Sequence, residues 1–232
     1  MLVVLASRHD QACRRLVAGW AGHASLLTCQ DLSARGWRYY SGGEAGASVL
    51  GGRLAPVGEI EGVLTRLPHV DESELGNIVP GDRGYVAAEM TAFLAAWLSD
   101  LRCPVLNRPT AVCLMGPHWR REKWVLTAAR LGIPVVTACR SVPAATHDGE
   151  ADLPGRSITL HVVGQRCVGH ADESLRGWAV ALAEAAGVGM LRARFTAAEA
   201  GPAFLDADYW VDIADPAVSE AMLGYFAGRP QR

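Results

Sequence analysis

The sequence predicts an α/β protein with an open, largely parallel N-terminal sheet and a smaller, mixed C-terminal sheet. Three observations support this class. Short apolar runs alternate with helical patterns over residues 1–137, which is typical of strands joined by crossover helices. A segment rich in Pro, Ala, Gly, Asp and Thr, 138–156, then predicts a linker. Strand-like runs around Gly164 predict a hairpin within a second domain, 157–232.

Short apolar runs predict the N-terminal strands at 2–6, 25–29, 61–67, 103–107 and 133–136. The first run shows no polar alternation, which favours a parallel strand buried on both faces. Gly51 and Gly52 lie between two short apolar segments, and this pattern predicts a hairpin with a two-residue turn.

Helices are predicted at 10–19, 84–101, 119–131, 173–186 and 216–226. The second of these has apolar residues at 3.6-residue spacing. The helix predicted at 119–131 is ended by Gly132 and Pro134. The helix predicted at 216–226 begins with Asp215 as its N-cap and Pro216 as its first residue. The remaining C-terminal strands are predicted at 157–163, 165–170, 190–195 and 203–213.

The composition excludes several classes of function. The chain has 232 residues, 50% of them hydrophobic and 20% charged, with a net charge of −2. This is a folded composition, and it argues against a nucleic-acid or membrane-surface partner, which would require clustered positive charge. The apolar runs are all shorter than the ~18 residues that a membrane span needs. Six cysteines without a C-x-x-C pair indicate reduced, mostly buried thiols in a cytoplasmic protein.

The common nucleotide, hydrolase and zinc-protease motifs are absent from the sequence. It contains no Walker A loop, no G-x-G-x-x-G after the first strand, no G-x-S-x-G and no H-E-x-x-H. Lys123 is its only lysine, so any phosphate-gripping lysine has one candidate.

The segments 47–70, 85–109 and 120–136 together resemble the N-terminal domain of ATP-grasp ligases, the group that includes ribosomal-peptide-modifying and glutamate-ligating enzymes. In that family a strand ends in arginine, matched by Arg66, and a helix carrying glutamate follows, matched by Glu89. A later strand ends in Asn-x-Pro, which begins here at Asn107. A basic residue then opens a helix, and Arg121 or Lys123 takes that place.

The C-terminal segments 157–171, 178–195 and 203–218 resemble the hairpin, helix and strands at the end of the same family. Asp206 and Asp208 match a Glu-x-Asn metal-binding pair, which implies Mg²⁺ as the cofactor. Residues i and i+2 of a strand share one face, so the two carboxylates can converge. The alternative is that they are ordinary solvated acids of an edge strand.

The chain departs from the family between these two regions. A large segment there carries the lysines that grip ATP and the strand that holds adenine, whereas this sequence has only the 20 residues 137–156, without lysine. The chain therefore resembles an ATP-grasp ligase that lacks its nucleotide clamp.

The candidate substrate-binding residues are Arg66, Asn107, Arg120, Arg121 and Lys123. Arg66 is expected at the carboxyl edge of the sheet, where open α/β folds bind ligands. It would bind a substrate anion there or form a structural salt bridge, for example with Glu89. The three basic residues open a helix, whose N-terminus favours anions, or they are solvated surface charge.

The resemblance implies an accessory or partner-binding protein of a bacterial biosynthetic or peptide-modification pathway. The expected partner is an enzyme or a peptide, and the expected assembly is a homo-oligomer. Two alternatives remain open: an active carboxylate–amine ligase with a remodelled Mg²⁺ and substrate site, and a small-molecule-binding module.

Overall fold

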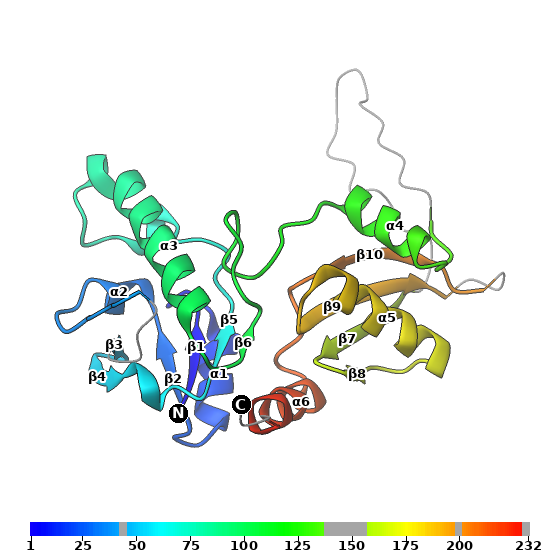
Figure 1. The fold of residues 1–232 in the computed structure, drawn as a ribbon, viewed down its shortest axis with the longest axis horizontal. Coiled ribbons are helices and arrows are strands. Elements are labelled where there is room, and N and C mark those ends of the chain that lie inside the picture. The colour runs from blue at the N-terminus through cyan, green and yellow to red at the C-terminus, as the bar shows by residue number, and fades with distance from the viewer. Residues whose placement is uncertain (42–45, 137–156, 198–200, 229–232) are drawn as a thin grey trace. The chain divides into compact units, whose positions relative to one another are not determined.

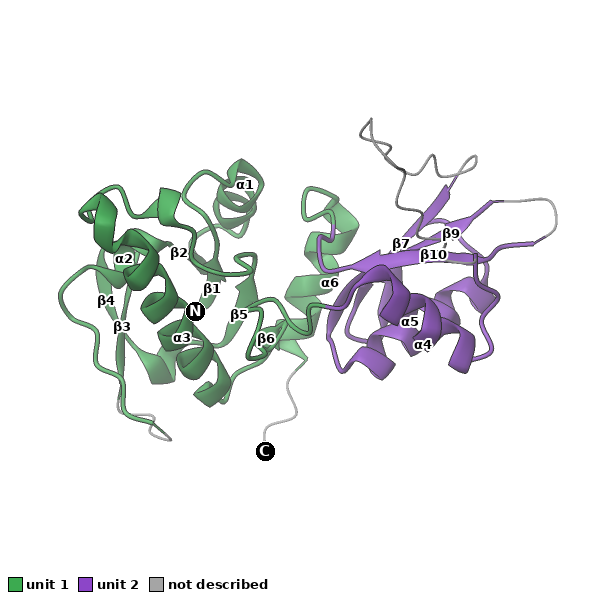
Figure 2. Cartoon of the chain, turned by 90° about the horizontal axis from the view of Figure 1, so that it is seen from above, with its two compact units in different colours: residues 1–118, 212–232 green, residues 119–211 purple. Residues whose placement is uncertain are grey.

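The computed structural model describes residues 1–41, 46–136, 157–197 and 201–228 (Figure 1). The chain forms two compact units (Figure 2): Met1–His118 with Asp212–Arg232, and Trp119–Val211. The domain boundaries expected at 137 and 156 therefore fall within unit 2. The expected linker, 138–156, lies outside the described residues. Unit 1 is discontinuous in sequence because the chain leaves it before α4 and returns to it before α6.

Unit 1 contains a four-stranded parallel sheet in the order β2-β1-β5-β6. The strands are β1 (Leu2–Leu5), β2 (Ala24–Leu27), β5 (Gly62–Thr65) and β6 (Val105–Leu106). All four residues of β1 and all four of β5 are buried, as a parallel sheet covered on both faces requires. The predicted largely parallel N-terminal sheet is confirmed.

Helix α3 (Arg83–Asp100) covers one face of this sheet (Figure 1). Its buried Leu94, Trp97 and Leu98 belong to the same hydrophobic core as Val3 and Val63. Smaller elements complete this side of the unit: α2 (Cys29–Leu32), the hairpin β3 (Ala47–Leu50) and β4 (Arg53–Pro56), and the 3₁₀ turns Val57–Glu59, Glu72–Glu74 and Pro80–Asp82.

The hairpin between β3 and β4 turns through the predicted glycine pair. Gly51 has φ 56° and Gly52 has φ 75°. Both values lie in the left-handed region, which L-residues with a side chain rarely adopt, and two such residues make the primed turn that suits twisted strands.

Helix α1 (Gln11–Gly19) is joined to α6 (Pro216–Ala227) within unit 1 through the residue that follows α1. The indole Nε1 of Trp20, which follows α1, donates to Ser219 Oγ at 3.0 Å, and its ring packs edge-on against Phe226. Asp215 caps α6 by accepting from the backbone N–H of Ala217, which confirms the predicted N-cap.

Unit 2 contains a four-stranded antiparallel sheet in the order β10-β9-β7-β8. The strands are β7 (Ser157–Val163), β8 (Arg166–Val168), β9 (Met190–Thr196) and β10 (Phe204–Asp208), and the helices are α4 (Arg121–Arg130) and α5 (Glu173–Ala186). The expected strand at 133–136 is reduced to one isolated parallel bridge between Val135 and Phe204. Two separate four-stranded sheets with helices confirm the predicted α/β class. Among the described residues, no helix is long and apolar enough to cross a membrane.

Candidate functional site

The order of the strands places a topological switch point between β1 and β5. The chain runs from β1 outward to β2, then returns to β5 on the other side of β1 and continues outward to β6. The connections leave these two central strands in opposite directions, and open α/β sheets bind ligands at the carboxyl ends of such strands. The residues that follow β1 and β5 are therefore the first candidates for a site.

Charged side chains meet at this switch point. Arg66, directly after β5, places its Nε 4.0 Å from Asp10 Oδ2, and Arg8, after β1, places its Nε 3.9 Å from Glu74 Oε2. The side chains of Arg66 and Glu74 are only 10% and 6% exposed. We name Arg8, Asp10, Arg66 and Glu74, together with Ser7, the switch-point cluster. Its two cations and two anions balance, which offsets part of the cost of burying charge.

Glu74 is the most buried acid of the cluster. One carboxylate oxygen accepts a hydrogen bond from the Ser7 hydroxyl, and the other, Oε2, is buried and accepts no hydrogen bond from the residues that the structure describes. Ionised carboxylates ordinarily accept several hydrogen bonds when they are buried, so Oε2 has unused acceptor capacity. An ammonium or amide donor would satisfy it.

Two buried thiols lie beside the cluster. Burial, reinforced by the Asp10 charge, raises the pKa of Cys13 from 9.0 to about 12, and the Cys13 thiol donates to Asp10 Oδ2 at 3.3 Å. Burial, reinforced by Glu74, also raises the pKa of Cys29 to about 12. Both thiols therefore stay protonated at neutral pH, which suits packing rather than nucleophilic chemistry.

Asn107, the predicted site residue after β6, is buried in the structure. Its side-chain amide donates to the backbone carbonyl of Met115 at 3.2 Å and is 1% exposed. The side chain thus ties the start of the loop that follows β6 to its end. Loop positioning is the role that this contact supports, and direct contact with a substrate stays a prediction.

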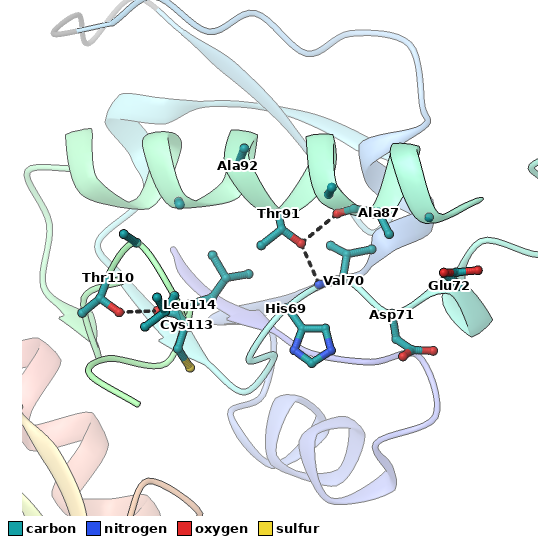
Figure 3. A pocket seen from close by; sticks show the side chains of 15 residues that line it. His69, Val70, Asp71, Glu72, Ala87, Thr91, Ala92, Thr110, Cys113 and Leu114 are labelled. Carbon is teal, nitrogen blue, oxygen red and sulfur yellow. Dashed lines mark hydrogen bonds between the residues drawn. The ribbon is translucent and has the colours of Figure 1, made fainter. Parts of the chain in front are cut away.

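An open groove lies between α3 and the two loops that leave β5 and β6 (Figure 3). It has a volume of about 530 Å³, and its walls are residues 69–72, the face of α3 between 84 and 95, and residues 110–114. We name it the α3 groove. The segment that follows β5 therefore contributes to both features. Arg66 and Glu74 belong to the switch-point cluster, and the loop between them lines the groove.

Hydrogen bonds hold the walls of the groove in place. Thr91 of α3 accepts from the backbone N–H of Val70 at 3.0 Å and donates to the carbonyl of Ala87 at 2.8 Å (Figure 3). The backbone N–H of Leu114 donates to the carbonyl of Pro68 at 2.8 Å, which joins the two loops. The groove therefore has anchored walls on both sides.

The two predicted metal ligands lie in unit 2, where each carboxylate has an arginine partner. Asp206 accepts from Arg194 Nε at 2.7 Å, and Asp208 accepts from Arg192 Nε at 3.0 Å. Among the described residues no group of three or more His, Cys, Asp or Glu side chains is placed to hold a metal ion. Mg²⁺ at this pair would have to displace two guanidinium groups, so the arrangement fits a charge-balanced sheet face better than a metal site.

The predicted basic residues at the start of α4 also lie in unit 2. Arg121 donates through Nε to the carbonyl of Leu205 at 3.2 Å, which joins the helix to β10. Lys123 places its Nζ 4.9 Å from the centre of the Trp119 ring, a cation–π contact. Arg120 is exposed and precedes the first residue of the helix.

The structure brings together some sequence-predicted residues and adds others. Within unit 1 it places Arg66 beside Asp10, which sequence reasoning had not singled out, while Glu89 lies exposed on α3. Ser7, Arg8 and Glu74 were also missed. For Ser7 and Arg8 the available signal was their position just after the first predicted strand, at the edge where α/β sheets bind ligands, whereas Glu74 lies farther along the loop that follows β5.

No protein-family model and no curated protein matches this sequence. Its fold does match solved structures. The macrocyclase MdnC from Microcystis aeruginosa MRC, bound with precursor peptide MdnA, aligns with a TM-score of 0.68 and 12% identity, over 99% of this chain and 100% of that chain. The ATP-grasp ligase PsnB, complexed with precursor peptide PsnA2 and AMPPNP, aligns with a TM-score of 0.64 and 14% identity, over 97% and 98%.

A third structure, the RiPP-associated ATP-grasp ligase of Chryseobacterium gregarium with ADP and a leader and core peptide, aligns with a TM-score of 0.65. The identity is 8%, over 100% of this chain and 97% of that chain. Identities this low establish the fold and nothing finer. The chain described above has an ATP-grasp-like fold.

Proposed function

We propose that this chain is an accessory, peptide-binding protein of a peptide-modification pathway, built on an ATP-grasp-like fold that lacks a nucleotide clamp. Whole-chain similarity to ligases crystallised with precursor peptides supports a peptide as the ligand. The observation that carries the proposal is the pairing of Asp206 with Arg194 and of Asp208 with Arg192. The carboxylates that match a metal-binding pair are engaged by arginine, so the pair needs no cation.

The length and composition of residues 137–156 support the same proposal. Only 20 residues, without lysine, connect the last described residue of the first part of the chain to β7. Triphosphate binding requires several cations or a nest of backbone N–H groups, together with Mg²⁺ held by carboxylates. A chain with one lysine and two arginine-paired aspartates supplies few of these groups.

Calorimetry and peptide binding test this function together. The probes are fluorescein-labelled peptides encoded by the short open reading frames beside the gene, with MdnA as a foreign control. We expect one of the peptides encoded beside the gene to bind with a micromolar Kd. Exposed charges such as Arg120 and Lys123 contribute only about 0–1 kcal/mol each, so the binding free energy of ATP with Mg²⁺ is expected to stay below about 4 kcal/mol, which corresponds to a Kd weaker than about 1 mM. Low-micromolar ATP binding, with ADP release on addition of peptide, would instead establish an active ligase.

A small zwitterionic ligand at the switch-point cluster is the second candidate function. The buried Oε2 of Glu74, which lies 3.9 Å from Arg8 Nε and accepts no hydrogen bond among the described residues, suits an ammonium group, and Arg66 suits a carboxylate. Thermal-shift measurements with free amino acids and dipeptides test it. We expect a rise in Tm that Arg66→Gln abolishes and that Arg14→Gln, on the exposed side of α1, preserves. A rise that is equal in both variants would remove the cluster from ligand binding.

We also propose that the protein works in the cytoplasm as a homo-oligomer with no nucleic-acid partner. Light scattering coupled to size-exclusion chromatography tests the assembly. A mass near 24.7 kDa at micromolar concentration would show a monomer and contradict this part of the proposal.

A further inference from the structure

The chemistry of the α3 groove changes along its length. Its floor on α3 consists of small side chains, with Ala88 and Ala92 exposed to solvent. Asp71 and Glu72 lie at one end, beside the first residues of α3 (Figure 3). Val112, which is 76% exposed, lies on the loop at the other end. The groove is therefore lined mainly by small apolar side chains, and one of its ends is negatively charged.

The negative end keeps its charge, and His69 is the one basic side chain among the described residues that line the groove. The hydroxyl and backbone N–H of Ser73 both stabilise the Asp71 carboxylate and hold its pKa below the ordinary value of 3.8. Among the described residues that line the groove, none is lysine or arginine. An occupant with a positive group at this end would therefore complement the groove electrostatically.

We propose that the α3 groove binds a peptide segment with small apolar side chains and a lysine or arginine at the end that lies against Asp71 and Glu72. This inference rests on the proposed function, because it names where and how the peptide binds. The exposed alanines let a peptide backbone approach α3 closely, since a methyl group is the largest obstacle there. The exposed Val112 supplies an apolar contact for the other end.

The dimensions of the groove set the length and form of the segment. The lining residues of α3 run from Gly84 to Ala95, and at 1.5 Å per residue this face is about 16 Å long. An extended peptide rises about 3.3 Å per residue, so about five residues fill the groove. A helix of that length and about 10 Å width would occupy about 1,300 Å³, so only part of it would fit into the groove volume of about 530 Å³. The extended form is therefore the one that fits.

Designed peptides test the charge preference. The probes are fluorescein-labelled peptides in which Gly-Ser flanks surround a five-residue core of Val, Ala and Leu, with lysine first, lysine last or no charge. At low salt we expect one lysine peptide to bind about three- to tenfold more tightly than the neutral peptide, as measured by anisotropy. The double variant Asp71→Asn/Glu72→Gln is expected to remove that preference. Glu89→Gln, an exposed α3 acid outside the groove, is the charge control.

A filled groove tests the location. Ala92→Phe places a ring in the groove, whereas Ala18→Phe places the same ring on an exposed position of α1, which does not line it. We expect the first variant to weaken binding at least about tenfold and the second to leave it unchanged, with equal Tm values showing that both fold. Equal binding by the two variants, or no preference for lysine, overturns the proposal.

The same two phenylalanine variants separate this inference from the proposed function. If a peptide encoded beside the gene binds wild type and both variants with equal affinity, the peptide-binding function stands and the α3 groove is not its site. Another outcome is that no peptide encoded beside the gene binds, while the designed peptides bind wild type and are weakened by Ala92→Phe. The groove is then a peptide site, and the assignment to a peptide-modification pathway fails.

Discussion

Arg194 on β9 and Asp206 on β10 are partners in the antiparallel register, and their side chains form an ion pair with Nε 2.7 Å from Oδ1. The hydrogen bond to Asp206 raises the pKa of Arg194 above its ordinary value. Arg192 and Asp208 repeat the arrangement two residues along each strand. Cross-strand pairs of opposite charge stabilise a sheet, and here they also neutralise the two acids for which the sequence predicted a metal role.

Removing the arginines is expected to increase the affinity for Mg²⁺. In the double variant Arg192→Gln/Arg194→Gln, both carboxylates lose their charged partners while the long side chains remain. We expect the Mg²⁺ affinity measured by calorimetry to rise roughly tenfold, because each displaced positive charge had opposed the cation. Unchanged heats would show that the arginines do not control this face.

The same titration tests the predicted role of the two aspartates. Any heat of Mg²⁺ or Mn²⁺ binding in wild type is expected to disappear in Asp206→Asn/Asp208→Asn. Equal heats for wild type and this variant would remove both residues from a metal role.

The Ser7 hydroxyl is expected to stabilise unit 1 through Glu74. Ser7→Ala removes the hydroxyl that donates to the buried Glu74 carboxylate, so the free energy of unfolding should fall by about 2 kcal/mol. In a Glu74→Leu background the same substitution should cost less than about 1 kcal/mol, since no carboxylate then needs the hydroxyl. Urea unfolding of the four proteins measures the difference, and equal costs in both backgrounds would contradict the coupling.

The buried thiols make stability depend on pH in the alkaline range. The pKa of Cys13 rises from 9.0 to about 12 on folding, so the unfolded chain loses this proton first as the pH increases. The contribution of Cys13 is complete below pH 9 and is lost between pH 9 and 12, at about 1.4 kcal/mol per pH unit. Urea unfolding at pH 8, 9.5 and 10.5 should show this decline. Cys13→Ala should reduce the slope, and an unchanged slope would contradict the assignment.

Gly62 is expected to be essential for the contact between β5 and α6. A Cβ atom at this position would lie 2.8 Å from Cε1 of Phe226, a rigid ring that would have to move. We expect Gly62→Ala to lower the free energy of unfolding by about 1–3 kcal/mol and Phe226→Leu to restore part of it. Gly58→Ala, where a Cβ meets nothing within 4 Å, is the control and should change stability by less than about 0.5 kcal/mol. Equal effects at positions 58 and 62 would show that α6 adapts freely.

Local sequence patterns were sufficient to predict most elements of the fold. The run 2–6 became β1, the spacing of apolar residues over 84–101 became α3, and Asp215 with Pro216 began α6. These features depend on neighbours within a few residues, which a single sequence displays. The short helix α2 was missed because four residues give too few turns for a periodic pattern.

The site was harder to predict because its contacts are distant in sequence. Ser7 and Glu74 lie 67 residues apart, and only the return of the chain from β2 to β5 brings them together. Arg66 was correctly placed at the end of a strand, but its neighbour Asp10 follows a different strand. The pairing of Asp206 with Arg194 required the register of β9 and β10, which composition and spacing do not determine.

The return of α6 to unit 1 has a consequence for synthesis on the ribosome. Trp20 and Gly62 emerge early, but Ser219 and Phe226, their partners, emerge only after all of unit 2. At 5–20 residues per second, the roughly 90 residues of unit 2 take about 5–20 s to translate. During that interval nascent unit 1 exposes the apolar surface that α6 later covers, whereas unit 2 is contiguous and is complete once it has emerged. Unit 1 thus begins to emerge from the ribosome before unit 2 but is completed after it.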